Sequence, residues 1–155
     1  MSGRIEARLK ELGLDIPTPA APAANYVPFM VSGRQVFIAG QITLWNGELK
    51  YVGKLGAGLK LADGQQAARI CALNLIAQAK AACGGDLDRL ARWVKIGGFV
   101  NSTPDFTDQA KVMNGASDLL VEVFGERGRH TRAAVGVSSL PFGVAVEIDG
   151  IFEIV

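Results

Sequence analysis

Two charged side chains near the end of the sequence have the chemistry to act on a small acidic molecule: Arg132 and Glu147. The guanidinium of an arginine offers five donors in a planar fork, which fits a carboxylate through two parallel hydrogen bonds. A glutamate on a largely apolar strand should have a raised pKa unless an arginine or backbone donors offset its burial. Glu147 is therefore a candidate general acid/base or a group that holds a water molecule. One hypothesis is a cleft in which Arg132 anchors a substrate carboxylate.

A structural role for the same two residues stays open. The strand pattern alone favours a salt bridge from Arg132 to Glu147 or to a neighbouring chain, because paired charges are commoner in proteins than sites. Glu147 would need no partner if its strand lay at the edge of a sheet and its carboxylate met solvent.

Two predicted strands must position these residues. Residues 133–137 are small or β-branched, and in residues 144–149 valine and isoleucine alternate with alanine, glutamate and aspartate. The sequence SLPFG between them contains a proline and a glycine that can turn the chain. We expect the two strands to pair across this turn and to bring Arg132 close to Glu147.

The preceding sequence predicts an α+β fold. Ile5, Leu9 and Leu12 recur at helical spacing, Gly13 can close that helix, and a proline-rich tether follows. The sequence SGR predicts a hairpin turn, Gly40 a bulge or close backbone approach, and Asn46-Gly47 a second hairpin. We expect helices at residues 61–83 and 103–128 and a strand at residues 90–102, with Thr103 or Asp105 capping the second long helix.

Two long helices cannot cover both sides of one mixed sheet, so we expect them to pack side by side on one face. The other face would then meet another copy of the chain or line a barrel.

Composition argues against several classes of function. The chain has 16 basic and 15 acidic residues without a basic stripe, which predicts no nucleic-acid partner. His130 is the only histidine, and no serine has the glycine-framed context of a nucleophile, so a serine hydrolase triad is not expected. Cys71 and Cys83 are typical of core thiols, and we expect no metal site. The apolar runs are too short for a membrane span and no signal peptide is expected, which favours a cytoplasmic protein.

Two segments of the sequence resemble a known family. TRAAVGVSSLPFGVAVEIDGI resembles the C-terminal signature of the Rid/YjgF family, the enamine/imine deaminases also called endoribonuclease L-PSP. APAANYVPFMVSGRQVFIAGQI resembles the N-terminal hairpin of that family. The likeness covers about residues 20–155. Residues 1–25, a helix and a proline-rich tether before the family domain at residues 26–155, resemble a branch of the family with an extra N-terminal helix.

The resemblance implies a chorismate-mutase-like fold, with one mixed sheet and two long helices on one face. It also implies a homotrimer in which the sheets close a central barrel and three clefts lie between subunits. No cofactor or metal is implied, and the ribonuclease activity reported for the family gets no support from the charge pattern.

The resemblance also assigns roles within the cleft. Arg132 matches the arginine that clamps a substrate carboxylate, and Glu147 matches the glutamate that holds the hydrolytic water. Tyr26 matches a tyrosine that reaches the cleft, and Asn114 matches an asparagine on the second helix. Two further positions contribute backbone groups to the substrate: Ala39 stands where the family usually has serine, and Ala134 where a cysteine often sits.

The implied activity is hydrolytic deamination of small 2-imino or enamino acids to 2-oxo acids and ammonia. A non-catalytic module that binds small carboxylated metabolites is one alternative. A trimeric chaperone or regulator that acts through its surface is another.

Overall fold

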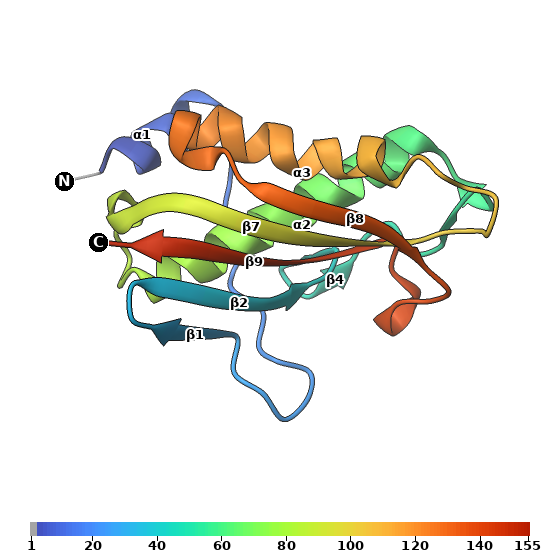
Figure 1. Cartoon of the computed structure of the whole chain (residues 1–155), viewed down its shortest axis with the longest axis horizontal. Helices are drawn as coiled ribbons and strands as arrows, with labels where there is room; N and C mark the ends of the chain where they lie inside the picture. Colours follow the sequence, from blue (N-terminus) through green and yellow to red (C-terminus); the bar gives the residue numbers. More distant parts are fainter. Residues whose placement is uncertain (1–2) are drawn as a thin grey trace.

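Five strands form one mixed sheet in the computed structural model, which describes residues 3–155 (Figure 1). Their order across the sheet is β1 (Phe29–Ser32), β2 (Gln35–Gln41), β9 (Val146–Ile154), β7 (Leu90–Asn101) and β8 (Thr131–Val137). Neighbours are antiparallel except β7 and β8, which run parallel. Two short ribbons complete the β structure: β3 (Leu44–Trp45) with β4 (Glu48–Leu49), and β5 (Lys54–Leu55) with β6 (Gly58–Leu59).

Two long helices, α2 (Leu61–Ala82) and α3 (Gln109–Phe124), pack on one face of the sheet (Figure 1). Side chains of a strand alternate between its two faces, and every second residue of β9 from Val146 to Ile154 is buried toward these helices. The residues between them are only half-buried, so the opposite face is open in the single chain. The prediction of an α+β fold with a mixed sheet and two helices on one face is therefore confirmed.

A glycine sets the distance between the two helices. A Cβ added at Gly115 in α3 would lie 2.1 Å from the carbonyl oxygen of Gln65 in α2, far inside van der Waals contact. The cost of a glycine within a helix is thus offset by a close approach of the two backbones that any side chain would prevent.

The predicted start of the second long helix is wrong. The helix begins at Gln109 and not near Thr103. The Thr103 hydroxyl bonds the carboxylate of Asp105 at 2.7 Å, and the backbone N–H of Thr103 bonds the carbonyl of Leu55 at 3.0 Å. These contacts hold residues 103–108 as a loop across the end of β7 and use the polar groups that would have capped a helix.

The predicted pairing of the last two strands is also wrong. β8 and β9 do not pair with each other, because β7 lies between them and pairs with both. The segment SLPFG is a connection from the edge strand to the middle of the sheet, with a single 3₁₀ turn at Pro141–Gly143.

The turns of the N-terminal half follow the predictions. β1 and β2 form a hairpin around Gly33, and Asn46 and Gly47 have φ of 48° and 89°, as a two-residue hairpin turn requires. The pairing of β2 with β9 shifts register between Ile38 and Gln41, which places the predicted bulge at Gly40.

The N-terminal helix α1 (Arg4–Glu11) packs onto the same hydrophobic core, where Ile5 and Leu9 are buried. The Asp88 carboxylate accepts hydrogen bonds from the backbone N–H groups of Arg4 and Ile5, at 2.9 and 3.0 Å. The proline-rich tether then crosses from α1 toward β1 at the far edge of the sheet (Figure 1). Within residues 3–155, no helix has the length and apolar character that a bilayer crossing requires.

Candidate functional site

Glu147 lies on β9 and points to the open face of the sheet, opposite the buried Val146 and Ile148. Burial raises the pKa of its carboxyl, and the nearby charge of Asp149 raises it further. Among residues 3–155 no donor lies within hydrogen-bond distance of this carboxylate. Glu147 is thus a half-buried acceptor that is free to hold water or substrate.

The bulge of β2 makes room for this carboxylate. A Cβ added at Gly40 would lie 2.7 Å from Oε2 of Glu147 and 3.0 Å from its carboxyl carbon. Since real Cβ atoms do not approach other atoms so closely, glycine lets the backbone pass beside the acid. The predicted close approach at Gly40 is therefore found at the candidate catalytic acid.

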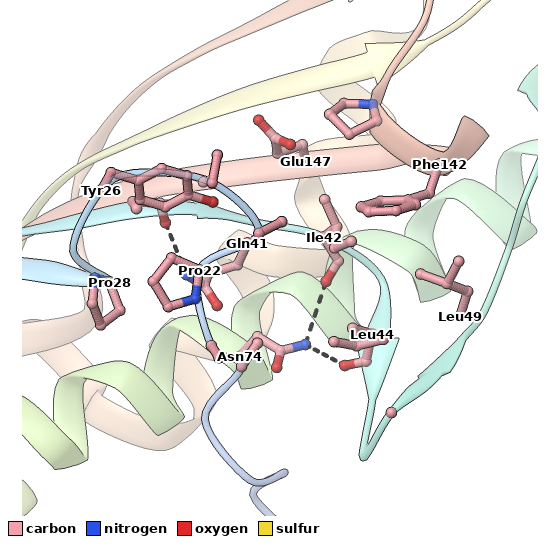
Figure 2. A pocket seen from close by; sticks show the side chains of 18 residues that line it. Pro22, Tyr26, Pro28, Gln41, Ile42, Leu44, Leu49, Asn74, Phe142 and Glu147 are labelled. Atoms are coloured by element: carbon pink, nitrogen blue, oxygen red, sulfur yellow. Dashed lines mark hydrogen bonds between the residues drawn. The ribbon is translucent and has the colours of Figure 1, made fainter.

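A cavity of about 600 Å³ opens beside Glu147 (Figure 2). Its walls come from the tether, the bulge of β2, the ribbon of β3 and β4, helix α2 and the loop before β9. Most lining residues are apolar: Ala20, Ala21, Pro22, Ala23, Ala24, Pro28, Ala39, Gly40, Ile42, Leu44, Gly47, Leu49, Pro141 and Phe142. The polar ones are Tyr26, Gln41, Asn74 and Glu147. Such a chamber, apolar with a few polar groups, is typical of small-molecule sites.

Buried amides hold the walls of this cavity in place. The side-chain amide of Asn74 donates to the carbonyl oxygens of Ile42 at 3.3 Å and Leu44 at 2.7 Å (Figure 2). The amide of Gln41 donates to the carbonyl of Ala39 at 2.9 Å. These hydrogen bonds to the backbone fix the two side chains, so both amides help to hold the shape of the cavity.

Arg132 lies elsewhere, on the edge strand β8. Its guanidinium donates to the hydroxyl of Ser117 at 3.0 Å and to the carbonyl of Ala110 at 2.9 Å, both on α3. No acid of residues 3–155 forms an ion pair with it, so the predicted salt bridge with Glu147 is wrong within one chain. The physical reason is the topology, because β7 separates the two strands.

A hydrogen-bonded chain that the sequence analysis missed supports Arg132. The Ser117 hydroxyl accepts from Arg132 and lies 2.8 Å from Nε2 of His130, while Nδ1 of His130 lies 2.6 Å from the carbonyl oxygen of Gly128. A carbonyl can only accept, so Nδ1 carries the proton and Nε2 accepts from Ser117. Burial lowers the pKa of His130, and the charge of Arg132 lowers it further, against the hydrogen bond to Gly128.

His130 has a hydrogen-bond partner in Ser117, but the pair has no acidic third member among residues 3–155 and does not form the serine hydrolase triad that the sequence analysis argued against. This hydroxyl is not a wall of the cavity beside Glu147. The sequence signal for this chain of hydrogen bonds was the spacing of His130 and Arg132. Side chains two residues apart in an extended segment point to the same face, which here is the face toward α3.

The remaining candidate residues fall into two groups. Tyr26 and Ala39 line the cavity with Glu147, and Tyr26 is exposed. Ala134 projects from β8 to the same face as Arg132 and packs at the border of the core. Asn114 is exposed on α3 and stands four residues after Ala110 and three before Ser117, on the helix face that holds the guanidinium.

The six candidates thus form two half-sites in one chain. One consists of Tyr26, Ala39 and Glu147, and the other of Asn114, Arg132 and Ala134. The structure brings together the members of each half-site but not the two half-sites.

Comparison with known proteins places the chain among relatives of this fold. A model of the family described as "YjgF/chorismate mutase-like, putative endoribonuclease" matches residues 6–148. Protein TCP17 of Trypanosoma cruzi is 52% identical over 154 residues, which cover 99% of this chain and 96% of that protein. The crystal structure of Atu1372 of Agrobacterium tumefaciens, a protein of unknown function, matches with a TM-score of 0.91 and 49% identity over 97% of this chain and 92% of that one. E. coli TdcF with bound serine has a TM-score of 0.63 and 26% identity over 90% and 94% of the two chains.

Proposed function

The chain belongs to the YjgF/chorismate mutase-like family, and from this premise we propose that it hydrolyses small 2-imino acids to 2-oxo acids and ammonia in clefts between the subunits of a homotrimer. In each cleft the cavity of one subunit, with Glu147, faces Arg132 of the next subunit. The observation that carries the proposal is the division of the candidate residues into two half-sites that one chain cannot join.

The open face of the sheet supports an assembly of this kind. Large apolar side chains are exposed on or beside it, including Met30 (56%), Phe37 (43%) and Val135 (47%). Met30 pairs with Phe37, and Phe37 with Ile151, so three adjacent strands present apolar side chains to solvent. Exposed apolar side chains on adjacent strands of a single chain are typical of a protein interface.

Arg132 is suited to hold the substrate carboxylate. Two of its N–H donors bind Ser117 and Ala110, which fixes the plane of the guanidinium. The other three donors of the fork remain for a carboxylate, and no acid of the chain competes for them within residues 3–155. A carboxylate held by this fixed guanidinium would also keep the imine carbon in one position for the attack of water.

Glu147 is suited to move the protons of the reaction. Its carboxylate takes a proton from water as the water oxygen adds to the carbon of the C=N bond. The resulting carbinolamine receives that proton on nitrogen, its C–N bond breaks, and ammonia leaves as the C=O bond forms and Glu147 takes the proton of the hydroxyl group. A carboxyl with a raised pKa serves both directions better than an ordinary one, since it holds the proton between the two steps. The scheme uses no cofactor, because an iminium carbon is already electrophilic.

The test is an imine-trapping assay. An amino-acid oxidase generates the 2-imino acid, and semicarbazide competes with hydrolysis to form a semicarbazone that absorbs light. Active protein lowers semicarbazone formation, and Arg132→Ala and Glu147→Gln each abolish this effect. If the wild-type protein binds the matching 2-oxo acid but never lowers the semicarbazone signal, the chain is a binding module and the catalytic proposal fails. If both variants keep wild-type activity in the assay, the two half-sites are not the site.

A further inference from the structure

We infer that the N-terminal tether and Phe142 make this site selective for 2-imino acids with apolar side chains of about leucine to phenylalanine size. This inference rests on the proposed function and names its substrate class. The inference rests on three features of the cavity: the segments that form its walls, the hydrogen bonds that fix those segments, and the scarcity of charged groups in the lining.

The tether forms one wall of the cavity and is fixed at both ends. Before the wall, the N–H of Thr18 donates to the side-chain oxygen of Asn46 at 2.9 Å, and the amide of the buried Gln78 donates to the carbonyl of Ala20 at 2.9 Å. After it, the N–H of Ala39 donates to the carbonyl of Pro28 at 2.9 Å. The segment between is thereby held across the opening as a fixed wall.

The composition of this wall is apolar and small. Residues 20–24 have the sequence AAPAA, so this wall presents alanine methyl groups and the ring of Pro22 to the cavity (Figure 2). Such groups offer dispersion contact without hydrogen bonds, and they leave space that larger side chains would fill. A ligand therefore gains binding free energy on this side of the cavity by burying apolar groups against the wall.

Phe142 forms the facing wall and is held in an uncommon conformation. It lines the cavity from the loop before β9, its side chain is 63% exposed, and its φ is 60° (Figure 2). A bulky residue with positive φ is strained, and strain of this kind is concentrated at functional sites. Here the strained turn keeps an aromatic ring over the mouth of the cavity instead of on the core.

The charge distribution around the cavity disfavours substrates with acidic or polar side chains. Among residues 3–155 no lysine, arginine or histidine lines it, and Glu147 is the one charged lining group. An imino acid with an acidic side chain would place a second carboxylate beside this acid, and no cation would remain to bind it once Arg132 of the next subunit holds the first. The amide nitrogens of Asn74 and Gln41 donate to backbone carbonyls, and most of the wall is apolar, so a polar side chain would exchange hydrogen bonds to water for contact with carbon.

The experiment measures kcat/KM for imines derived from alanine, 2-aminobutyrate, norvaline, leucine, phenylalanine and glutamate. Burying one methylene favours binding by roughly fourfold, so we expect an increase of about 50-fold from the alanine-derived to the leucine-derived imine. The glutamate-derived imine should fall below the norvaline-derived one. Phe142→Ala and Pro22→Ser should each reduce the leucine-to-alanine ratio by about tenfold. Pro19→Ser is the matched control, because Pro19 is an exposed tether residue outside the lining, and its ratio should stay at the wild-type value.

Binding of the corresponding 2-oxo acids, measured by calorimetry without any turnover, separates this inference from the proposed function. The same order of affinity with no catalysis supports the apolar subsite and contradicts the deaminase. Catalysis with a flat series, or with preference for the alanine-derived or glutamate-derived imine, overturns the inference and leaves the deaminase intact. An unchanged ratio in both Phe142→Ala and Pro22→Ser would also overturn it.

Discussion

Arg132 and Glu147 point to opposite faces of the same sheet. Arg132 pairs with Ile96 and through it with Gly150, while Glu147 pairs with Phe99 and through it with Val135. The two side chains are therefore on different strands, three residue pairs apart, and on different sides of β7. No small molecule can touch both within one chain, so a site that uses both must form between two chains.

The pKa of Glu147 should set the acid limb of the activity profile. Since burial and the charge of Asp149 raise this pKa above its ordinary 4.5, the carboxylate needed to accept a proton from water is lost at a higher pH than for an exposed glutamate. Asp149→Asn removes one of the two causes, so its acid limb should move to lower pH. The measurement is kcat/KM against pH for both proteins. An acid limb that does not move, or moves upward, would contradict this role of Glu147.

The same carboxyl should destabilise the folded protein at neutral pH. A group whose folded pKa is raised costs stability when it is ionised, and this cost disappears as the pH falls through the raised value toward 4.5. Glu147→Gln should therefore have a higher Tm than wild type at pH 7, and the difference should vanish near pH 4.5. Thermal unfolding at both pH values measures it. A variant less stable than wild type at pH 7 would show that the acid is a structural group.

Ser117 and His130 should act through Arg132. Ser117→Ala removes the acceptor that fixes the guanidinium, so we expect KM to rise by about tenfold with kcat nearly unchanged, as loss of one hydrogen bond to a charged group predicts. In an Arg132→Ala background the same substitution should change KM no further. An equal effect in both backgrounds would mean that Ser117 acts on the fold and not on Arg132.

Protonation of His130 should weaken the fold. Its folded pKa is lowered from 6.5, so its stabilising contribution is full above pH 6.5 and is lost as the pH falls through the unfolded and then the folded value. Nitrogen NMR should show the proton on Nδ1 at pH 7. His130→Gln should remove this part of the pH dependence of Tm, and a variant that keeps it would place the titration on another group.

A side chain at Gly40 should push Glu147 out of place. The added Cβ of Gly40→Ala would meet the carboxylate at 2.7 Å, so the acid must turn away from the cavity. We expect kcat to fall by about tenfold, because the acid/base group is displaced but not removed. The Tm should stay within about 3 °C of the wild-type value. Full activity in this variant would separate the reaction from the position of Glu147.

Local sequence patterns predicted the helices, strands and turns of this fold better than they predicted which strands lie side by side in the sheet. The Asn46-Gly47 turn, helix α2 and the bulge at Gly40 depend on residues close in sequence, and these predictions were confirmed. The position of β7 between β8 and β9 depends on packing between distant segments, and the alternation of residues 144–149 carries no information about it.

Two features of the site could not be read from spacing. The start of α3 was misplaced because Thr103 and Asp105 are good helix caps that bond each other instead. The tether showed no periodicity, so nothing in its sequence revealed that it would become a wall of the cavity beside Glu147. Arg132 and Glu147 stood out as charged residues on apolar strands and the family resemblance assigned their roles, but the division into two half-sites emerged only from the strand order.

The most direct measurement mixes subunits of the two variants Arg132→Ala and Glu147→Gln. Each variant alone should be inactive, because every cleft then lacks one half-site. In trimers assembled at random from equal amounts, about one quarter of the clefts combine an intact Glu147 with an intact Arg132 of the neighbour, so about one quarter of wild-type activity should return. Hybrid trimers that stay as inactive as their parents would contradict a site shared between chains.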